Sequence, residues 1–194
     1  MTQLRTNLRG ERVRLRALGE EDAKEFFALV EQSREHLRTW LPWVDSHLSE
    51  EHSEAFLSAA EMQLEMENGG LWGIEVNKAL VGCVSLHWIQ WDHRSTSLGY
   101  WLGKNFEGHG LAYDACRLLI HHCFEDLKLN RMEVSAAEAN LRSLLLAQKL
   151  GFCEEGVRRE YEHLHGKFWD HRALSMLLSD FRNLGSSSNQ NWSV

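Results

Sequence analysis

A glycine-containing stretch carries the residue types in this sequence that can bind a ligand most directly. It reads Glu107-Gly108-His109-Gly110-Leu111-Ala112. An apolar segment precedes it and a segment with helical periodicity follows it, so we expect a turn from a strand into a helix. The first N–H groups of a helix lack partners within the helix, and glycine lets a phosphate approach them closely. The stretch therefore predicts a pyrophosphate-binding loop.

Two other kinds of glycine loop do not fit. The stretch lacks the Gly-Lys-Ser/Thr of a nucleoside-triphosphate loop. It also lacks the three-glycine fingerprint of a dinucleotide-binding turn, and no acidic ribose partner can be assigned. A Gly-x-Gly pair alone also occurs in ordinary tight turns, so the neighbouring motifs must decide its role.

Three further motifs surround the loop. They are Leu98-Gly99-Tyr100-Trp101-Leu102 before it, then Asn140-Leu141-Arg142-Ser143 and Lys149-Leu150-Gly151-Phe152 after it. In this order, over residues 12–182, the chain resembles the GNAT superfamily of N-acetyltransferases. Within it, the chain resembles the Rim-type branch that acetylates ribosomal proteins on serine or alanine. The family's loop begins with Gln or Arg, whereas Glu107 stands here and adds a negative charge near the phosphates.

The resemblance implies acetyl-coenzyme A as co-substrate and no metal. In such a fold, the strand that ends with Tyr100, Trp101 and Leu102 splays from the strand at 132–137. The pantetheine arm lies in the gap and pairs with free backbone groups, as an added strand would. Asn140 is expected to hydrogen-bond that arm, although Asn is also common as a turn or cap residue.

Acetyl transfer to an amine needs a base for the ammonium, a donor for the oxyanion and an acid for the departing thiolate. The resemblance implies a main-chain N–H near Trp101 or Leu102 as the oxyanion donor. Many family members place a tyrosine acid where this chain has Ala147. In the Rim-type branch a serine is proposed instead, and it matches Ser143. The other interpretation of Ser143 is a cap of the helix N-terminus.

The branch's proposed base is a glutamate on the penultimate strand, and it aligns with Glu162. Glu160 is the alternative, and a solvent-facing carboxylate is the ordinary interpretation of both. We expect direct attack within a ternary complex, because Cys116 and Cys123 lie on the interior helix face by their spacing. An acetyl-cysteine step is therefore not expected.

The acceptor expected from the branch is a protein N-terminal α-amine, with ribosomal proteins as the precedent. Two alternatives stay open. One is a small-molecule amine such as a polyamine, an aminoglycoside or an aminoacyl conjugate. The other is a module that binds acyl-coenzyme A without catalysis. Trp40 and Trp43 lie in a segment that covers the acceptor cleft in this fold, and they are either pocket or core residues.

Hydrophobic periodicity outlines the elements that position these motifs. Strands are expected over residues 13–18, 71–76, 80–88, 96–102, 132–137, 156–164 and 168–178, and helices from Glu20 onward and over 50–68, 111–127 and 141–150. This order indicates an α/β (α+β) fold with a mixed, mostly antiparallel sheet flanked by helices. We expect a single domain over residues 1–184 and a disordered tail over 185–194.

Composition limits the remaining possibilities. The chain has 194 residues and a formal net charge of −7, which argues against nucleic-acid binding. It has no apolar run long enough for a membrane span and no signal peptide, so we expect a cytoplasmic protein. Its four cysteines and eleven histidines show no disulfide or zinc spacing. The branch also implies a homodimer.

Overall fold

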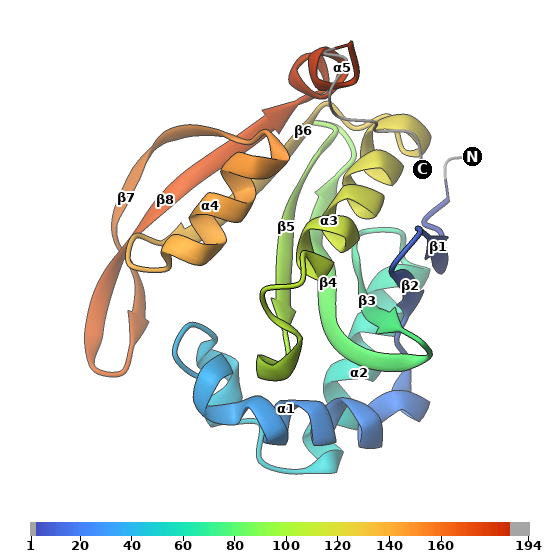
Figure 1. The fold of residues 1–194 in the computed structure, drawn as a ribbon, viewed down its shortest axis with the longest axis vertical. Coiled ribbons are helices and arrows are strands. Elements are labelled where there is room, and N and C mark those ends of the chain that lie inside the picture. Colours follow the sequence, from blue (N-terminus) through green and yellow to red (C-terminus); the bar gives the residue numbers. More distant parts are fainter. Residues whose placement is uncertain (1–2, 187–194) are drawn as a thin grey trace.

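The computed structural model describes residues 3–186, which form one eight-stranded sheet with helices on both faces (Figure 1). The strand order is β1-β2-β3-β4-β5-β6-β8-β7. The strands are β1 (Asn7–Arg9), β2 (Arg14–Ala17), β3 (Gly70–Val76), β4 (Ala79–Gln90), β5 (Ser95–Leu102), β6 (Arg131–Ala137), β7 (Cys153–Leu164) and β8 (Lys167–Leu177). Every neighbouring pair is antiparallel except β5 and β6. The mixed, mostly antiparallel sheet is thereby confirmed.

The helices form two layers, one on each face of the sheet. Alternate residues of a strand face opposite sides, so both faces present apolar side chains that a helix can cover. The α-helices are α1 (Ala23–Leu37), α2 (Glu50–Glu65), α3 (Leu111–His121), α4 (Leu141–Leu150) and α5 (Leu178–Ser186). The short helices are η1 (Glu20–Asp22), η2 (Pro42–Asp45), η3 (Lys104–Phe106) and the π-helix η4 (His122–Asp126). Buried residues of α3 and α4 form one core with the sheet, and those of α1 and α2 form a second core on the other face.

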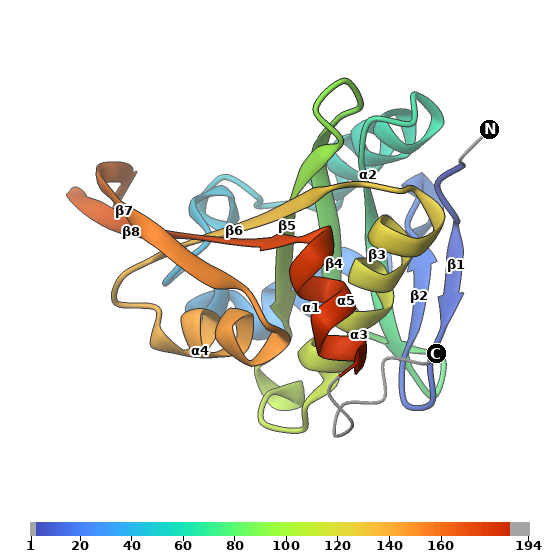
Figure 2. The same ribbon diagram turned by 90° about the horizontal axis from the view of Figure 1, so that it is seen from above.

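The parallel pair β5 and β6 separates after a short contact. Only Ser95–Ser97 of β5 pairs with Arg131–Glu133 of β6. Beyond these residues the two strands diverge, and the sheet opens between them (Figures 1 and 2). Residues 98–102 therefore lack a neighbouring strand on the β6 side, which is the gap expected from the family resemblance.

Helix α4 has the expected bounds because its end signals are strong. Asn140 accepts a hydrogen bond from the Ser143 backbone N–H at 3.3 Å and caps the N-terminus. Gly151 ends the helix with φ +101°, a left-handed conformation that suits glycine. Leu144, Ala147 and Leu150 are buried along one face. The two residues of most interest for chemistry, Asn140 and Ser143, are thus held at a defined helix start.

Several boundaries differ from the sequence prediction. Strand β1 and helix α5 were not predicted, because β1 is three residues long and α5 follows β8 without a break. The helix expected over 111–127 ends at His121 and continues as the π-helix. Helix α2 ends at Glu65, before the expected end at 68. Of the tail expected over 185–194, residues 187–194 lie outside the described residues and the first two belong to α5.

Candidate active site

The glycine loop has a backbone that only glycine adopts without strain. Gly108 and Gly110 have φ values of +82° and +78°, and Gly110 occupies the N-cap position of α3 without a side-chain cap. A Cβ built on Gly108 would meet no atom within 4 Å, so the loop borders open space there. Arg12 fixes the loop from behind by donating to the His109 carbonyl at 2.9 Å and pairing with Asp114 at 2.5 Å. The uncapped helix start beside this space suits a phosphate.

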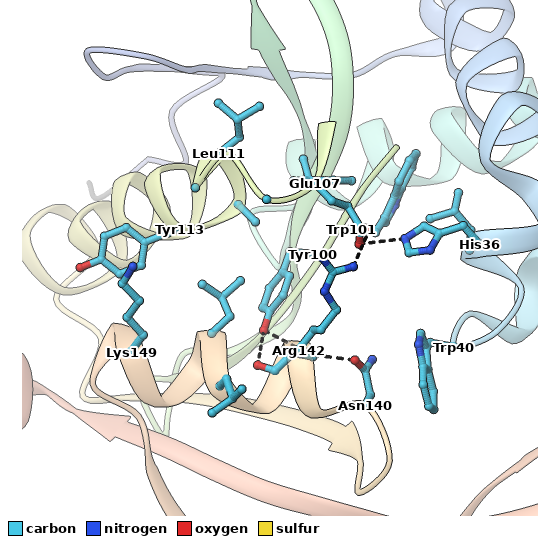
Figure 3. A pocket seen from close by; sticks show the side chains of 18 of the residues that line it. His36, Trp40, Tyr100, Trp101, Glu107, Leu111, Tyr113, Asn140, Arg142 and Lys149 are labelled. Carbon is cyan, nitrogen blue, oxygen red and sulfur yellow. Dashed lines mark hydrogen bonds and ion pairs between the residues drawn. The ribbon is translucent and has the colours of Figure 1, made fainter. Parts of the chain in front are cut away.

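A cavity of about 390 Å³ lies between this loop, β5, α4 and the end of α1 (Figure 3). It has the size of a small-molecule site. The expected cofactor-binding and catalytic residues that line it are Tyr100, Trp101, Leu102, Glu107, Gly108, Gly110, Leu111, Ala112, Asn140 and Ser143. His109 does not line it. Residues separated in the sequence by a strand and a helix therefore converge on one site.

Glu107, the departure from the family's loop, is surrounded by basic side chains. Its carboxylate lies 2.7 Å from the Arg142 guanidinium, 3.0 Å from the His36 ring and 3.2 Å from the Lys104 ammonium. Partial burial alone would raise the pKa of Glu107, but the hydrogen bond from Lys104 and the charges of His36 and Arg142 lower it. The extra negative charge is thus balanced locally. Spacing alone does not reveal this cluster, since His36 comes from α1.

Tyr100 and Ser143 form a hydroxyl pair at the inner end of the cavity. The Tyr100 hydroxyl lies 2.9 Å from Ser143 Oγ and donates to the Ser143 carbonyl at 3.0 Å. Burial raises the pKa of Tyr100 well above its ordinary value, so the phenol stays protonated. Asn140 supplies the helix cap, so the Ser143 hydroxyl is not used for capping. A hydroxyl aimed into the cavity with a neutral phenol beside it suits proton donation.

The structure does not bring Glu162 into this cavity. Glu162 lies on β7, half-buried, with Oε2 3.3 Å from Nε2 of His171, whose other ring nitrogen contacts Ser135 Oγ at 3.1 Å. It pairs in register with Trp169, whose ring packs edge-on against Trp40 at 6.0 Å.

Glu160, the alternative base, is exposed. It lies in an irregular segment of β7 with φ +49°, and its backbone N–H donates to the Asp170 carboxylate at 2.8 Å. Neither Glu160 nor Glu162 lines the cavity at the loop.

A second cavity of about 430 Å³ opens on the opposite face of the sheet, beneath α2. Helix α2 contributes Phe56 and Met62 to its wall, Met66 follows the helix directly, and β4 contributes Ser85 and His87. Apart from Trp43, Tyr100 and Trp101, sequence reasoning did not identify its residues, because they are spread over separate elements with no motif. It meets the first cavity at three residues that line both, which are Leu41, Tyr100 and Trp101.

The cysteines of α3 and η4 are not arranged as nucleophiles. Cys116 and Cys123 are fully buried, and burial raises the pKa of both thiols well above the ordinary value. Within residues 3–186, no cluster of three or more His, Cys, Asp or Glu side chains has a metal-binding arrangement. In the same part of the chain, no helix is long and apolar enough to span a membrane.

The Acetyltransferase (GNAT) domain family matches residues 12–153, well over half of the chain. "Putative ribosomal N-acetyltransferase YdaF" of Bacillus subtilis (strain 168) is 33% identical over 86% of this chain and 92% of that protein. The ribosomal-protein-serine acetyltransferase of Escherichia coli (strain K12) is 26% identical over 82% of this chain and 89% of its own. The spermidine N(1)-acetyltransferase of Vibrio cholerae is 27% identical over 56% of this chain and 63% of that protein.

A solved structure shows the same fold. RimL, a ribosomal L7/L12 alpha-N-protein acetyltransferase in complex with coenzyme A, superposes with a TM-score of 0.86. The match covers 88% of this chain and 97% of that one, at 20% identity.

Proposed function

The chain belongs to the GNAT family of acetyltransferases, and we propose that it acetylates the α-amino group of a protein N-terminus. As a member, it is an acetyl-coenzyme A-dependent N-acetyltransferase. The observation that carries the proposal is the meeting of two cavities at Tyr100 and Trp101, one beside the glycine loop and one on the opposite face. Such an arrangement lets an acyl donor and an acceptor reach the same point from two sides.

The residues of the first cavity fit coenzyme A. The uncapped start of α3 with Gly108 and Gly110 would hold the pyrophosphate, and the unpaired backbone of β5 would hold the pantetheine arm. Arg142, which is paired with Glu107, also lines this cavity. When bound, acetyl-coenzyme A supplies an activated acetyl thioester.

The chain's own residues would then manage the protons. We propose that Ser143 Oγ delivers a proton to the departing thiolate, since its hydroxyl lines the cavity next to the Tyr100 phenol. Glu162 remains our candidate for taking the amine's proton, directly or through water. A main-chain N–H near Trp101 or Leu102 would stabilise the developing negative charge. Buried, protonated Cys116 and Cys123 favour direct transfer within a ternary complex.

Two other functions remain to be separated from this one. A small-molecule amine acceptor is favoured by the similarity to the spermidine acetyltransferase. A binding module would bind acyl-coenzyme A and leave it intact. Thiol release from acetyl-coenzyme A, measured against N-terminal peptides, polyamines and aminoglycosides, separates the three. The proposed function predicts thiol release with peptides. A non-catalytic binding module predicts no thiol release with any acceptor.

Replacing Gly110 with valine is expected to weaken coenzyme A binding about tenfold or more. The left-handed φ of +78° costs a non-glycine residue about 1–2 kcal/mol, so the loop must shift away from the phosphate position. Calorimetry with coenzyme A measures the effect. Gly166→Val is the matched control, because Gly166 also has a positive φ of +72° but lies in the β7–β8 turn. Unchanged affinity in folded Gly110→Val protein would show that the loop is only a turn.

We also propose a cytoplasmic homodimer that binds neither nucleic acid nor membrane. The apolar side chains of Val157, Tyr161 and Phe168 are exposed on the β7–β8 hairpin and are available for a second copy. Sedimentation is expected to give twice the chain mass of 22.5 kDa at micromolar concentration. A single species at the chain mass across that range would exclude the dimer.

A further inference from the structure

The chemistry of the second cavity indicates which amines the site accepts. We propose that this cavity binds an α-amine whose own residue carries a bulky apolar side chain, with the amine at His87 and Ser85 and the side chain against Met62, Met66 and Trp88. This inference rests on the proposed function and narrows its acceptor. The serine and alanine termini suggested by the branch, and polyamines, would then be poor substrates.

The position of the cavity makes it the acceptor side. It lies on the face of the sheet that α1 and α2 cover, whereas the glycine loop lies at the other cavity. The two spaces meet at Leu41, Tyr100 and Trp101. A donor bound along β5 therefore presents its reacting end to the second cavity at these residues.

The inner part of the cavity is polar but carries no charge. Ser85 Oγ lies 3.1 Å from His87 Nε2, and the two side chains lie over Gly99 of β5. A Cβ on Gly99 would come within 2.5 Å of the His87 ring and 2.8 Å of Ser85 Oγ, so this arrangement requires glycine. Gly99 directly precedes Tyr100, which places the imidazole next to the point where the cavities meet.

His87 is suited to a neutral amine. Although the ring is exposed within the cavity, the surrounding protein limits its hydration, and this desolvation lowers the pKa of His87. A neutral imidazole and a hydroxyl can both accept hydrogen bonds from an amine's N–H groups.

The rest of the lining is largely apolar apart from Gln63, Asn68 and Tyr100, and it contains no carboxylate. The side chains of Met62, Met66 and Trp88 line it and are exposed by 54%, 63% and 68%. Thioethers and aromatic rings adapt to apolar groups of different shapes. Among the described residues that line the cavity there is no Asp, Glu, Lys or Arg.

This wall discriminates against polycations. A polyamine has a second and often a third ammonium, and the lining of this cavity offers no carboxylate to pair with it. The carboxylates of Glu61 and Glu65 on α2 are exposed and do not line the cavity. A peptide that begins with methionine or phenylalanine instead offers one amine and one apolar side chain, which match the polar inner part and the apolar wall.

The experiment measures thiol release from acetyl-coenzyme A with peptides that differ only in their first residue, together with spermidine. We expect kcat/KM for methionine- and phenylalanine-initiated peptides to exceed that for serine- or alanine-initiated peptides and for spermidine by about tenfold or more. If serine or alanine termini are preferred, the inference is wrong while the proposed N-terminal acetylation stands. If spermidine is preferred, both the inference and the protein N-terminal acceptor are wrong, and the small-molecule alternative is favoured. If no acceptor stimulates thiol release, the proposed function fails as well.

Variants assign the preference to this cavity. The double variant Met62→Glu, Met66→Glu is expected to reduce the preference about tenfold, because it places charge against the apolar side chain. Both positions are exposed, so the protein should fold, and Leu48→Glu at a position exposed by 65% outside the cavity is the control. His87→Phe should raise the peptide KM while coenzyme A affinity by calorimetry stays unchanged. A preference that survives in the double variant, or a peptide KM that is unchanged in His87→Phe, would overturn the assignment.

Discussion

Replacing Ser143 with alanine is expected to lower kcat by roughly 10²-fold or more, the usual contribution of a general acid. Without the hydroxyl, the thiolate must depart unprotonated, so the loss should persist at every pH below the pKa of the departing thiol. Coenzyme A affinity should stay unchanged, because Asn140 caps α4 through the Ser143 backbone rather than its side chain. Thiol release gives kcat, and calorimetry gives the affinity.

Two further variants test whether the hydroxyl is responsible. Ser143→Thr keeps a hydroxyl and should restore part of the activity. Tyr100→Phe removes the phenol that lies 2.9 Å from Ser143 Oγ and should also lower kcat. If Tyr100 acts through Ser143, the double variant Tyr100→Phe, Ser143→Ala should be no slower than Ser143→Ala alone. Full activity in Ser143→Ala would exclude the serine as the acid.

Replacing Glu162 with glutamine is expected to lower turnover at neutral pH by about 10²-fold, and the loss should shrink as the pH rises. The direction of this pH dependence follows from the pKa of the acceptor amine. Only the free amine attacks, and an α-amine has a pKa near ~8, so above that pH it forms without a base. A lysine amine, with a pKa near ~10.4, would recover only at higher pH. The pH profile of kcat/KM for a peptide acceptor measures this recovery.

Glu160→Gln is the matched control, since Glu160 lies two residues earlier on the same strand and is exposed. Thermal unfolding of both variants checks whether loss of the contact between Glu162 and His171 destabilises the fold. The carbonyl of a glutamine at position 162 can still accept a hydrogen bond from the His171 ring. Full activity of Glu162→Gln at neutral pH would place the base elsewhere, with Glu160 as the next candidate. If neither carboxylate matters, the amine loses its proton to water before it binds.

Local signals made much of the fold predictable. The cap at Asn140 and the left-handed Gly151 defined α4 to the residue, and the apolar runs on either side of the turn at residues 77–79 defined β3 and β4 within one or two positions. The glycine loop could be predicted because its proposed role depends on the local backbone and not on a residue distant in the sequence. Strand β1 was not readable, since three residues are too few for a periodic pattern.

The contacts that complete the site were not predictable from such signals. Tyr100 and Ser143 are 43 residues apart, and their hydroxyls meet only because β5 and α4 border the same gap. The Glu107 carboxylate contacts the ring of His36 on α1, a helix that is separated from it in the sequence by β3, β4 and β5. The second cavity depends on how α2 lies over β4. These relations belong to tertiary packing rather than to spacing along the chain.

The opening between β5 and β6 also bears on how the protein avoids aggregation. Unpaired strand edges invite pairing with other chains, and natural sheets protect them with short strands, charges and irregularities. The outer edges here follow that rule, since β1 has three residues and β7 carries Glu154, Arg158 and a register shift. The unpaired edge of β5 instead lies at a cavity of about 390 Å³, which is too small for another sheet. The unpaired backbone groups of β5 can thus bind a narrow ligand but are not accessible to a strand of another protein.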